Sequence, residues 1–80
     1  MNLSTLTELI IKSLVKDPDS ISVKQFDEED EIIIEVIVSE DEMGSVIGKD
    51  GKIANSIRTI VQASSYLKDN KRVKINISSI

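Results

Sequence analysis

The segment that decides the fold is Val46-Ile47-Gly48-Lys49-Asp50-Gly51-Lys52-Ile53, in which two glycines stand three residues apart. Glycine permits the dihedral angles of a tight turn and lets another backbone approach closely. A helix that begins after Gly51 directs its free amides and the positive end of its dipole toward the loop. Because Lys49 and Lys52 add positive charge, the segment predicts a site for an anion, and a phosphodiester is the obvious one.

The spacing of the glycines does not by itself specify a ligand. A plain helix–turn–helix corner has the same pattern, and this alternative stays open from the four loop residues alone. A phosphate-binding P-loop is excluded, since it needs four residues between its glycines and then Lys-Ser/Thr. Here only three residues separate Gly44 from Gly48, and Asp50 follows Lys49.

The residues before this segment predict one helix and two strands. Residues 3–15 place apolar side chains at helical spacing, with Ser4 or Thr5 as the expected cap. Asp17-Pro18 ends that helix, because proline disfavours a helical residue before it. Residues 21–26 predict a short strand and the acidic residues 27–30 a turn. Residues 31–39 are apolar on both faces, which is typical of a central strand.

The residues around and after the glycines predict two helices and a third strand. Glu40, Asp41 and Glu42 suit the first turn of a short helix, where acids complement the helix dipole. The second helix has an apolar stripe formed by Ile53, Ile57, Ile60 and Val61. After a turn at residues 69–70, apolar and polar residues alternate over 73–78, which predicts a half-buried strand.

The predicted order is therefore α-β-β-α-α-β in a single α+β domain over residues 1–80. The first two strands form an antiparallel hairpin. The second and third run parallel through a right-handed crossover if they are neighbours. We expect a three-stranded mixed sheet with three helices on one face.

In this context the glycine segment resembles a KH domain, and the leading helix and hairpin resemble its type II topology. Residues 48–61 (GKDGKIANSIRTIV) are similar to the KhpA-type family of small bacterial proteins that consist of one KH domain. The resemblance covers nearly the whole chain, most closely over residues 43–61 and least over 1–30. It implies single-stranded RNA binding of the RNA-chaperone or post-transcriptional regulator type, with about four nucleotides held and the loop clamping the backbone.

The resemblance also implies which residues meet RNA. Gly48 and Gly51 shape the loop, Lys49 meets a phosphate, and Lys52 and Arg58 follow on the helix. Two further sets of residues have a structural alternative to RNA binding. The wall of the RNA groove, or simply the core, would contain Ile47, Ala54 and Ile57. The border of the groove, or a solvated strand edge, would contain Lys71, Arg72 and Lys74.

Two departures from the family pattern predict weaker binding. Asp50 places a negative charge inside the clamp, or it caps the second helix by accepting an amide hydrogen bond. Residues 27–31 are five consecutive acids in a loop that, by the resemblance, can lie near the groove.

The charge is divided unevenly along the chain. The net charge of −4 argues at first against a polyanion ligand. However, residues 1–47 hold 12 acids and 3 bases, whereas residues 48–80 hold 7 bases and 2 acids. The positive half contains the glycine loop, so the net charge does not exclude RNA. This uneven distribution of charge predicts RNA binding that is weak, local and orientation-specific.

Composition argues against catalysis and metal binding. The chain has no cysteine and no histidine, so it lacks the usual nucleophile, the usual general base and the usual metal ligands. The carboxylates cluster in turns and do not predict an acid–base pair. We expect no cofactor. The longest uninterrupted apolar run is far too short for a membrane span, and no signal peptide is visible, which predicts a cytoplasmic protein without a membrane partner.

Two functions of different classes remain. The first is a non-catalytic RNA-binding protein which, by the family resemblance, forms homodimers or heterodimers with a larger KH protein of the Jag (KhpB) type and acts in cell elongation and division. The second is a protein–protein dimerisation module with weak or lost RNA binding, supported by the acidic total and by Asp50. Phe26, Ile33 and Ile37 are expected to share the helix-free sheet face, where apolar residues suit a partner.

Overall fold

The computed structural model describes residues 2–80, and its elements follow the predicted order. The helices and strands are α1 (Leu3–Leu14), β1 (Ser22–Asp27), β2 (Glu31–Val38), α2 (Met43–Ile47), α3 (Lys52–Lys68) and β3 (Arg72–Ser79). Three short 3-10 turns join them, at Pro18–Ser20, Glu40–Glu42 and Lys49–Gly51. The acids expected in the first turn of the short helix therefore form a 3-10 turn before α2.

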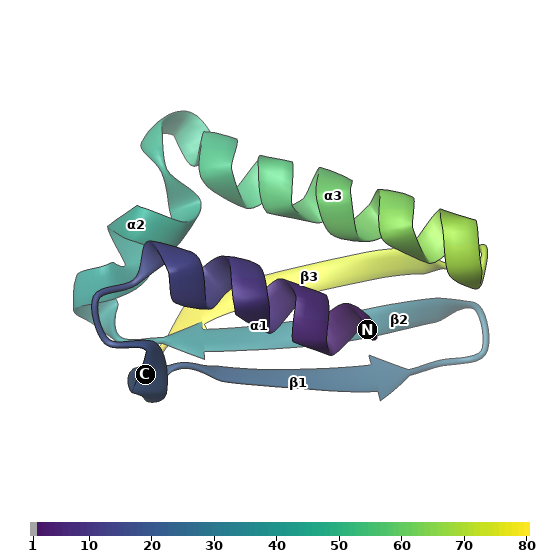
Figure 1. Ribbon diagram of the computed structural model, residues 1–80, viewed down its shortest axis with the longest axis horizontal. Helices are drawn as coiled ribbons and strands as arrows, with labels where there is room; N and C mark the ends of the chain where they lie inside the picture. Colours follow the sequence, from purple (N-terminus) through teal and green to yellow (C-terminus); the bar gives the residue numbers. More distant parts are fainter. Residues whose placement is uncertain (1) are drawn as a thin grey trace.

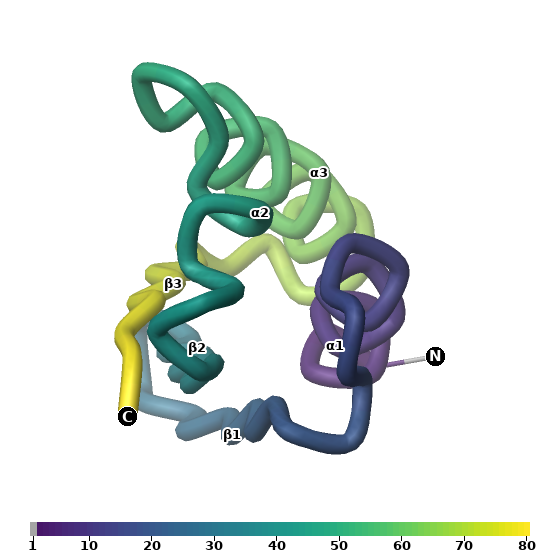
Figure 2. Tube along the Cα trace, turned by 90° about the vertical axis from the view of Figure 1, so that its left-hand side faces the viewer, coloured from purple at the N-terminus to yellow at the C-terminus, as the bar shows by residue number. Residues whose placement is uncertain are grey.

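The three strands form one mixed sheet in the order β1-β2-β3. β1 pairs with β2 antiparallel, and β2 pairs with β3 parallel, as predicted. All three helices lie over the same face of this sheet, and α1 and α3 lie side by side (Figures 1 and 2). The sequence prediction of an α+β fold with a helix-free sheet face is confirmed.

The core lies between β2 and the helices. The four even-numbered residues of β2, which point toward the helices, are at most 3% exposed: Ile32, Ile34, Val36 and Val38. They pack in one cluster with Ile11 of α1, Val46 of α2, and Ile57 and Val61 of α3. The pairing of Phe26 with Ile33 places both on the opposite face, as expected from their position in the alternation.

Two predictions about the helices are wrong. α1 is capped by Asn2, whose side chain accepts a hydrogen bond from the Thr5 backbone N–H at 2.8 Å, so neither Ser4 nor Thr5 is the cap. Ile60 does not belong to the buried stripe of α3 and is 50% exposed. Of the predicted stripe, Ile57 and Val61 are buried and Ile53 is half-buried. Ala54 and Ser65 complete the buried face of α3.

No helix within residues 2–80 combines the length and the apolar character needed to cross a membrane.

Candidate nucleic-acid interface

The loop between α2 and α3 has a backbone that depends on its two glycines. Gly48 has φ 77° and Gly51 has φ 75°, both in the region that side chains disfavour. A Cβ atom at Gly48 would also lie 2.6 Å from Ile53 Cγ1, so a side chain is excluded there by space as well as by backbone. Asp50, between them, has φ 58°, a conformation that Asp adopts more readily than most residues.

Some of the amides expected to be free are used inside the loop. The Gly51 N–H donates to the Gly48 carbonyl at 3.2 Å, and the Lys52 N–H donates to the Lys49 carbonyl. No side chain caps α3, so the interpretation of Asp50 as a cap is wrong. The Asp50 carboxylate is exposed, and its charge stays in the loop.

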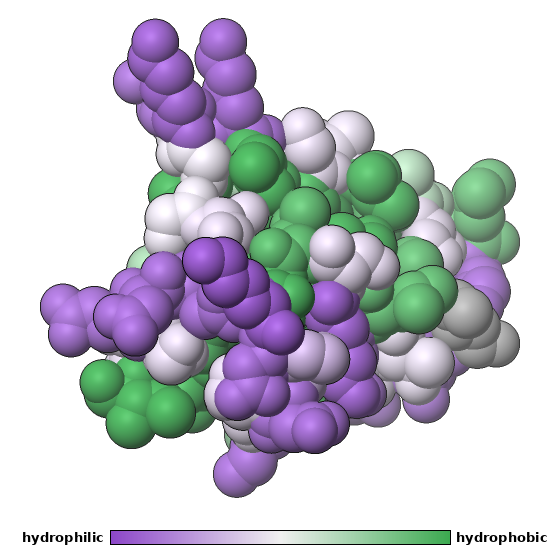
Figure 3. All heavy atoms as spheres, turned by 60° about the vertical axis from the view of Figure 1, so that its left-hand side comes forward, coloured by the Kyte–Doolittle hydropathy of each residue, from purple (hydrophilic) through white to green (hydrophobic). Residues whose placement is uncertain are grey.

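The loop carries its charges into solvent. Lys49 and Lys52 are both exposed, and within residues 2–80 neither lies within ion-pair distance of a carboxylate. The loop projects from one corner of the molecule (Figures 1 and 2), and hydrophilic side chains extend from the top of the face seen in Figure 3. Lys49 and Lys52 could therefore bind an anion without first losing an ion pair to a carboxylate of residues 2–80.

Side chains of α3 cover the outer edge of β3. Arg58 donates from Nε and Nη2 to the Ile75 carbonyl at 3.4 and 3.3 Å. Gln62 accepts from the Val73 N–H at 2.8 Å and donates to the Lys71 carbonyl at 2.9 Å. These contacts hold the edge strand against α3. Gln62 was not singled out from the sequence, although its position four residues after Arg58 puts both on the same helix face.

Three of the predicted cations meet beside this edge. A hollow of about 530 Å³ is lined by Glu31, Arg58, Arg72, Val73, Lys74, Ile75 and Asn76. Arg58, Arg72 and Lys74 are exposed and belong to two different elements. The structure thus brings these three together next to β3, at a place separate from Lys49 and Lys52. Glu31 is the one acid of the 27–31 run among the residues that line the hollow.

The remaining predicted residues lie elsewhere. The prediction of Ala54 as groove wall is corrected, because its side chain is 1% exposed and packs inside; Ile57 is likewise core at 2%. Ile47 is half-buried at the end of α2. Lys71 lies in the turn before β3, and its Nζ donates to the Glu28 carbonyl at 3.3 Å. The acidic turn is consequently tied to the α3–β3 turn, at the end of the molecule opposite the glycine loop (Figure 1).

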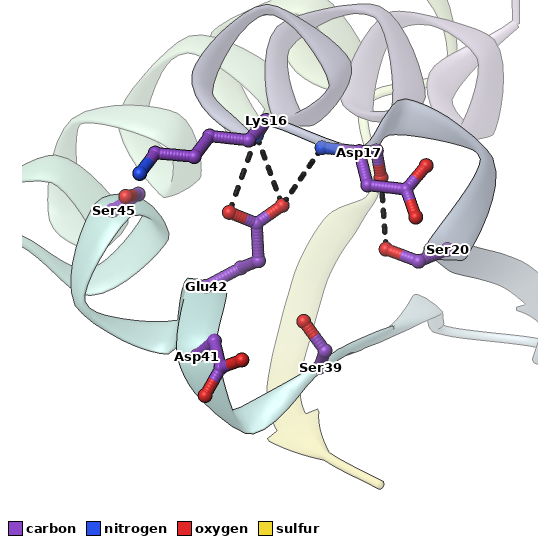
Figure 4. A pocket seen from close by; sticks show the side chains of 7 residues that line it. All are labelled: Lys16, Asp17, Ser20, Ser39, Asp41, Glu42 and Ser45. Carbon is purple, nitrogen blue, oxygen red and sulfur yellow. Dashed lines mark hydrogen bonds between the residues drawn. The ribbon is translucent and has the colours of Figure 1, made fainter.

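A buried carboxylate that was not predicted as important fixes the start of α2. Glu42 is 7% exposed and accepts hydrogen bonds from the Lys16 N–H at 2.9 Å and the Asp17 N–H at 3.0 Å (Figure 4). It therefore ties the segment after α1 to the helix that leads into the glycine loop. From the sequence, Glu42 has no feature that distinguishes it from its exposed neighbours Glu40 and Asp41.

The fold and the glycine loop define a KH domain, and comparison with known proteins agrees. The family model for the KhpA/KhpB KH domain matches residues 4–77. The chain belongs to this family. It is 47% identical to the RNA-binding protein KhpA of Clostridium perfringens over 72 residues, which cover 90% of this chain and 95% of that protein. It is 36% identical to the KhpA of Thermotoga maritima, over 90% of this chain and 93% of that protein. The family is not enzymatic, in line with the expectation from composition.

Solved structures share the fold. A crystal structure of Aquifex aeolicus Era Y63A bound to GDP·AlF4⁻ matches 98% of this chain with a TM-score of 0.73 and 20% identity. A structure of Era with MgGDPNP and nucleotides 1506–1542 of 16S ribosomal RNA matches 96% with a TM-score of 0.68, also at 20% identity. This chain spans 30% and 29% of the respective Era chains, so the similarity concerns one domain.

Proposed function

We propose that this protein is a cytoplasmic, non-catalytic RNA-binding protein of the RNA-chaperone or post-transcriptional regulator type. The observation that carries the proposal is the loop from Gly48 to Lys52, where the glycines enforce a tight backbone. Its two lysines are exposed and have no acidic partner among residues 2–80. The relatives named as RNA-binding proteins support it.

In this proposal the loop holds the sugar–phosphate backbone of a single strand. Gly48 and Gly51 bring the protein backbone close to the strand, and Lys49 pairs with a phosphate. Lys52 at the start of α3 adds a second charge, and Ile47 gives an apolar contact beside the loop. Arg58, Arg72 and Lys74 then attract the strand along β3. Phosphate contacts of this kind give affinity without sequence preference.

Asp50 lowers the affinity of the loop for the RNA backbone. Its exposed carboxylate lies between the residues that meet phosphate, and it repels the same group that Lys49 attracts. We therefore expect micromolar affinity that decreases as the salt concentration rises.

Association with other KH proteins is the second part of the proposal. We propose that the chain forms homodimers and also pairs with a larger KH protein of the KhpB type, in the control of cell elongation and division. The supporting feature is the helix-free sheet face, where Phe26 is 49% exposed and lies beside Ile33 in the register. Apolar side chains on a sheet face that no helix covers suit contact with a partner.

A protein–protein module without RNA binding is the alternative, favoured by the exposed charge of Asp50 and by the net charge of −4. Binding of fluorescently labelled, mixed-sequence single-stranded RNA to wild type and to Lys49→Asp separates the two. We expect the variant to lose at least about tenfold in affinity, because it replaces an attraction to phosphate by a repulsion. Its urea midpoint should stay unchanged, because Lys49 is exposed and forms no ion pair with any residue that the structure describes.

Lys24→Asp is the matched control, since it makes the same charge change on exposed β1, away from the loop. Its affinity for RNA should remain near that of wild type. The proposal fails if wild type binds no RNA, or if Lys49→Asp binds as wild type does.

A further inference from the structure

A second cavity extends farther along α3 and shares only Arg58 with the residues assigned to RNA above. It measures about 470 Å³ and is lined by Arg58, Thr59, Gln62, Ala63, Tyr66 and Val73. Tyr66 is the single tyrosine of the chain and is 54% exposed. None of the residues that line this cavity is acidic.

The cavity continues the surface of the proposed interface. Arg58 lines both this cavity and the hollow that contains Arg72 and Lys74. Along the helix axis Tyr66 lies about 12 Å beyond Arg58 and about 21 Å beyond Lys52, at 1.5 Å per residue. A strand that leaves the loop and follows the seam between α3 and β3 therefore passes Arg58 before it reaches Tyr66.

Three of the polar side chains that line the cavity, Arg58, Thr59 and Gln62, already form hydrogen bonds within the protein. The Gln62 amide accepts from the Val73 N–H of β3 and donates to the Lys71 carbonyl in the turn before it, and the Thr59 hydroxyl donates to the Asn55 carbonyl at 2.9 Å. The Arg58 guanidinium contacts the Ile75 carbonyl. Apart from the Tyr66 hydroxyl, little hydrogen-bonding capacity remains in the cavity to select one base over another. A half-exposed phenol ring in the same cavity as a guanidinium suits a nucleotide, whose base stacks on the ring and whose phosphate is attracted by the cation.

We propose that Tyr66 and Arg58 form a second nucleotide subsite, in which a base of the RNA strand stacks on Tyr66 whatever its identity. This inference rests on the proposed RNA binding and extends it, because it predicts a footprint longer than the strand held at the glycine loop. It assigns the outer α3–β3 seam to RNA.

Tyrosine fluorescence tests the inference on the wild-type protein. Because the chain has one tyrosine and no tryptophan, its intrinsic emission reports on Tyr66 alone. We expect mixed-sequence RNA decanucleotides to quench this emission at saturation, and mixed-sequence tetranucleotides bound at the loop to leave it nearly unchanged. Saturating decanucleotide without quenching would overturn the subsite.

Substitutions test it independently. Tyr66→Ala should weaken decanucleotide binding by about five- to a hundredfold, the range that stacking of one base gives, and should leave tetranucleotide binding unchanged. Tyr66→Phe keeps the ring and should bind as wild type. Leu67→Ala is the matched control, because Leu67 is 88% exposed and does not line the cavity.

The possible failures are distinguishable. If wild type binds neither oligonucleotide, the proposed function itself fails and this subsite with it. If Lys49→Asp abolishes binding but Tyr66→Ala binds the decanucleotide as wild type does, only the subsite is overturned. If Tyr66→Ala changes the oligomeric state in sedimentation and leaves RNA affinity unchanged, the cavity belongs to a protein contact and the subsite is likewise overturned.

Discussion

At the N-terminal end of α2 the important charge is buried, whereas at its C-terminal end the important charges are exposed. Glu42 is 7% exposed and is held by two backbone N–H groups of the segment after α1. Lys49 and Lys52, at the other end, are exposed and have no carboxylate within ion-pair distance among residues 2–80. The hydrogen bonds of Glu42 stabilise the fold, whereas the charges of Lys49 and Lys52 remain accessible to a ligand. One short helix thus separates a residue that stabilises the fold from two residues that we propose bind RNA.

Removing the buried charge should have the largest effect on stability. Glu42→Ala leaves the Lys16 and Asp17 amides without their acceptor, and we expect the free energy of unfolding to fall by about 3 kcal/mol. Urea denaturation measures this loss. Glu40→Ala, at an exposed position of the same turn, should change it little. Equal urea midpoints for the two variants would show that Glu42 does not stabilise the contact between the segment after α1 and the start of α2.

A side chain at Gly48 should lower both the stability of the protein and its affinity for RNA. Gly48→Ala forces a side chain into φ 77° and against Ile53, and we expect a loss of about 2 kcal/mol together with weaker RNA binding. Gly44→Ala, in α2 just before the loop, is the control, since a Cβ there meets nothing within 4 Å. That change should stabilise the protein by about 0.5–1 kcal/mol. A Gly48 variant as stable as the Gly44 variant would contradict the strained geometry of the loop.

The smallest effect is expected at Asp50, and it should be a gain. Asp50→Asn removes the negative charge, and Asn tolerates the left-handed backbone at φ 58° as Asp does. We expect RNA affinity to rise severalfold at low salt, with no change in the urea midpoint. Asp19→Asn, an exposed acid in the segment after α1, should leave affinity unchanged. Unaltered binding by Asp50→Asn would mean that the carboxylate does not face the RNA.

The sequence was sufficient to predict the fold because each element has a clear period. The alternation in β2 and the helical spacing of α3 indicate which face of each element is buried. The order of the elements along the chain then predicts an antiparallel pair and a parallel pair, which together form a mixed sheet. Ile60 was misplaced because it adjoins Val61, and spacing alone does not tell the edge of a buried stripe from its centre.

The site was predicted less completely, for a different physical reason. The glycine loop is local in sequence, so its tight backbone could be predicted from the spacing of Gly48 and Gly51. Glu42 and Gln62 act through backbone groups that are distant in the chain, Lys16 and Val73, and no local pattern marks such contacts. Ala54 illustrates the same limit, since a small apolar residue on an amphipathic helix fits a groove and a core equally well.

The salt dependence of RNA binding tests most directly the claim that the exposed end of α2 acts on phosphate. Affinities of wild type and Lys49→Gln for the same single-stranded RNA should be measured from low to high salt, and the logarithm of the association constant plotted against the logarithm of the salt concentration. We predict a negative slope for wild type that becomes shallower by about 0.7 in the variant, the value for one lost phosphate contact on a single strand. Equal slopes for the two proteins, or a wild-type affinity independent of salt, would contradict the assignment of the loop.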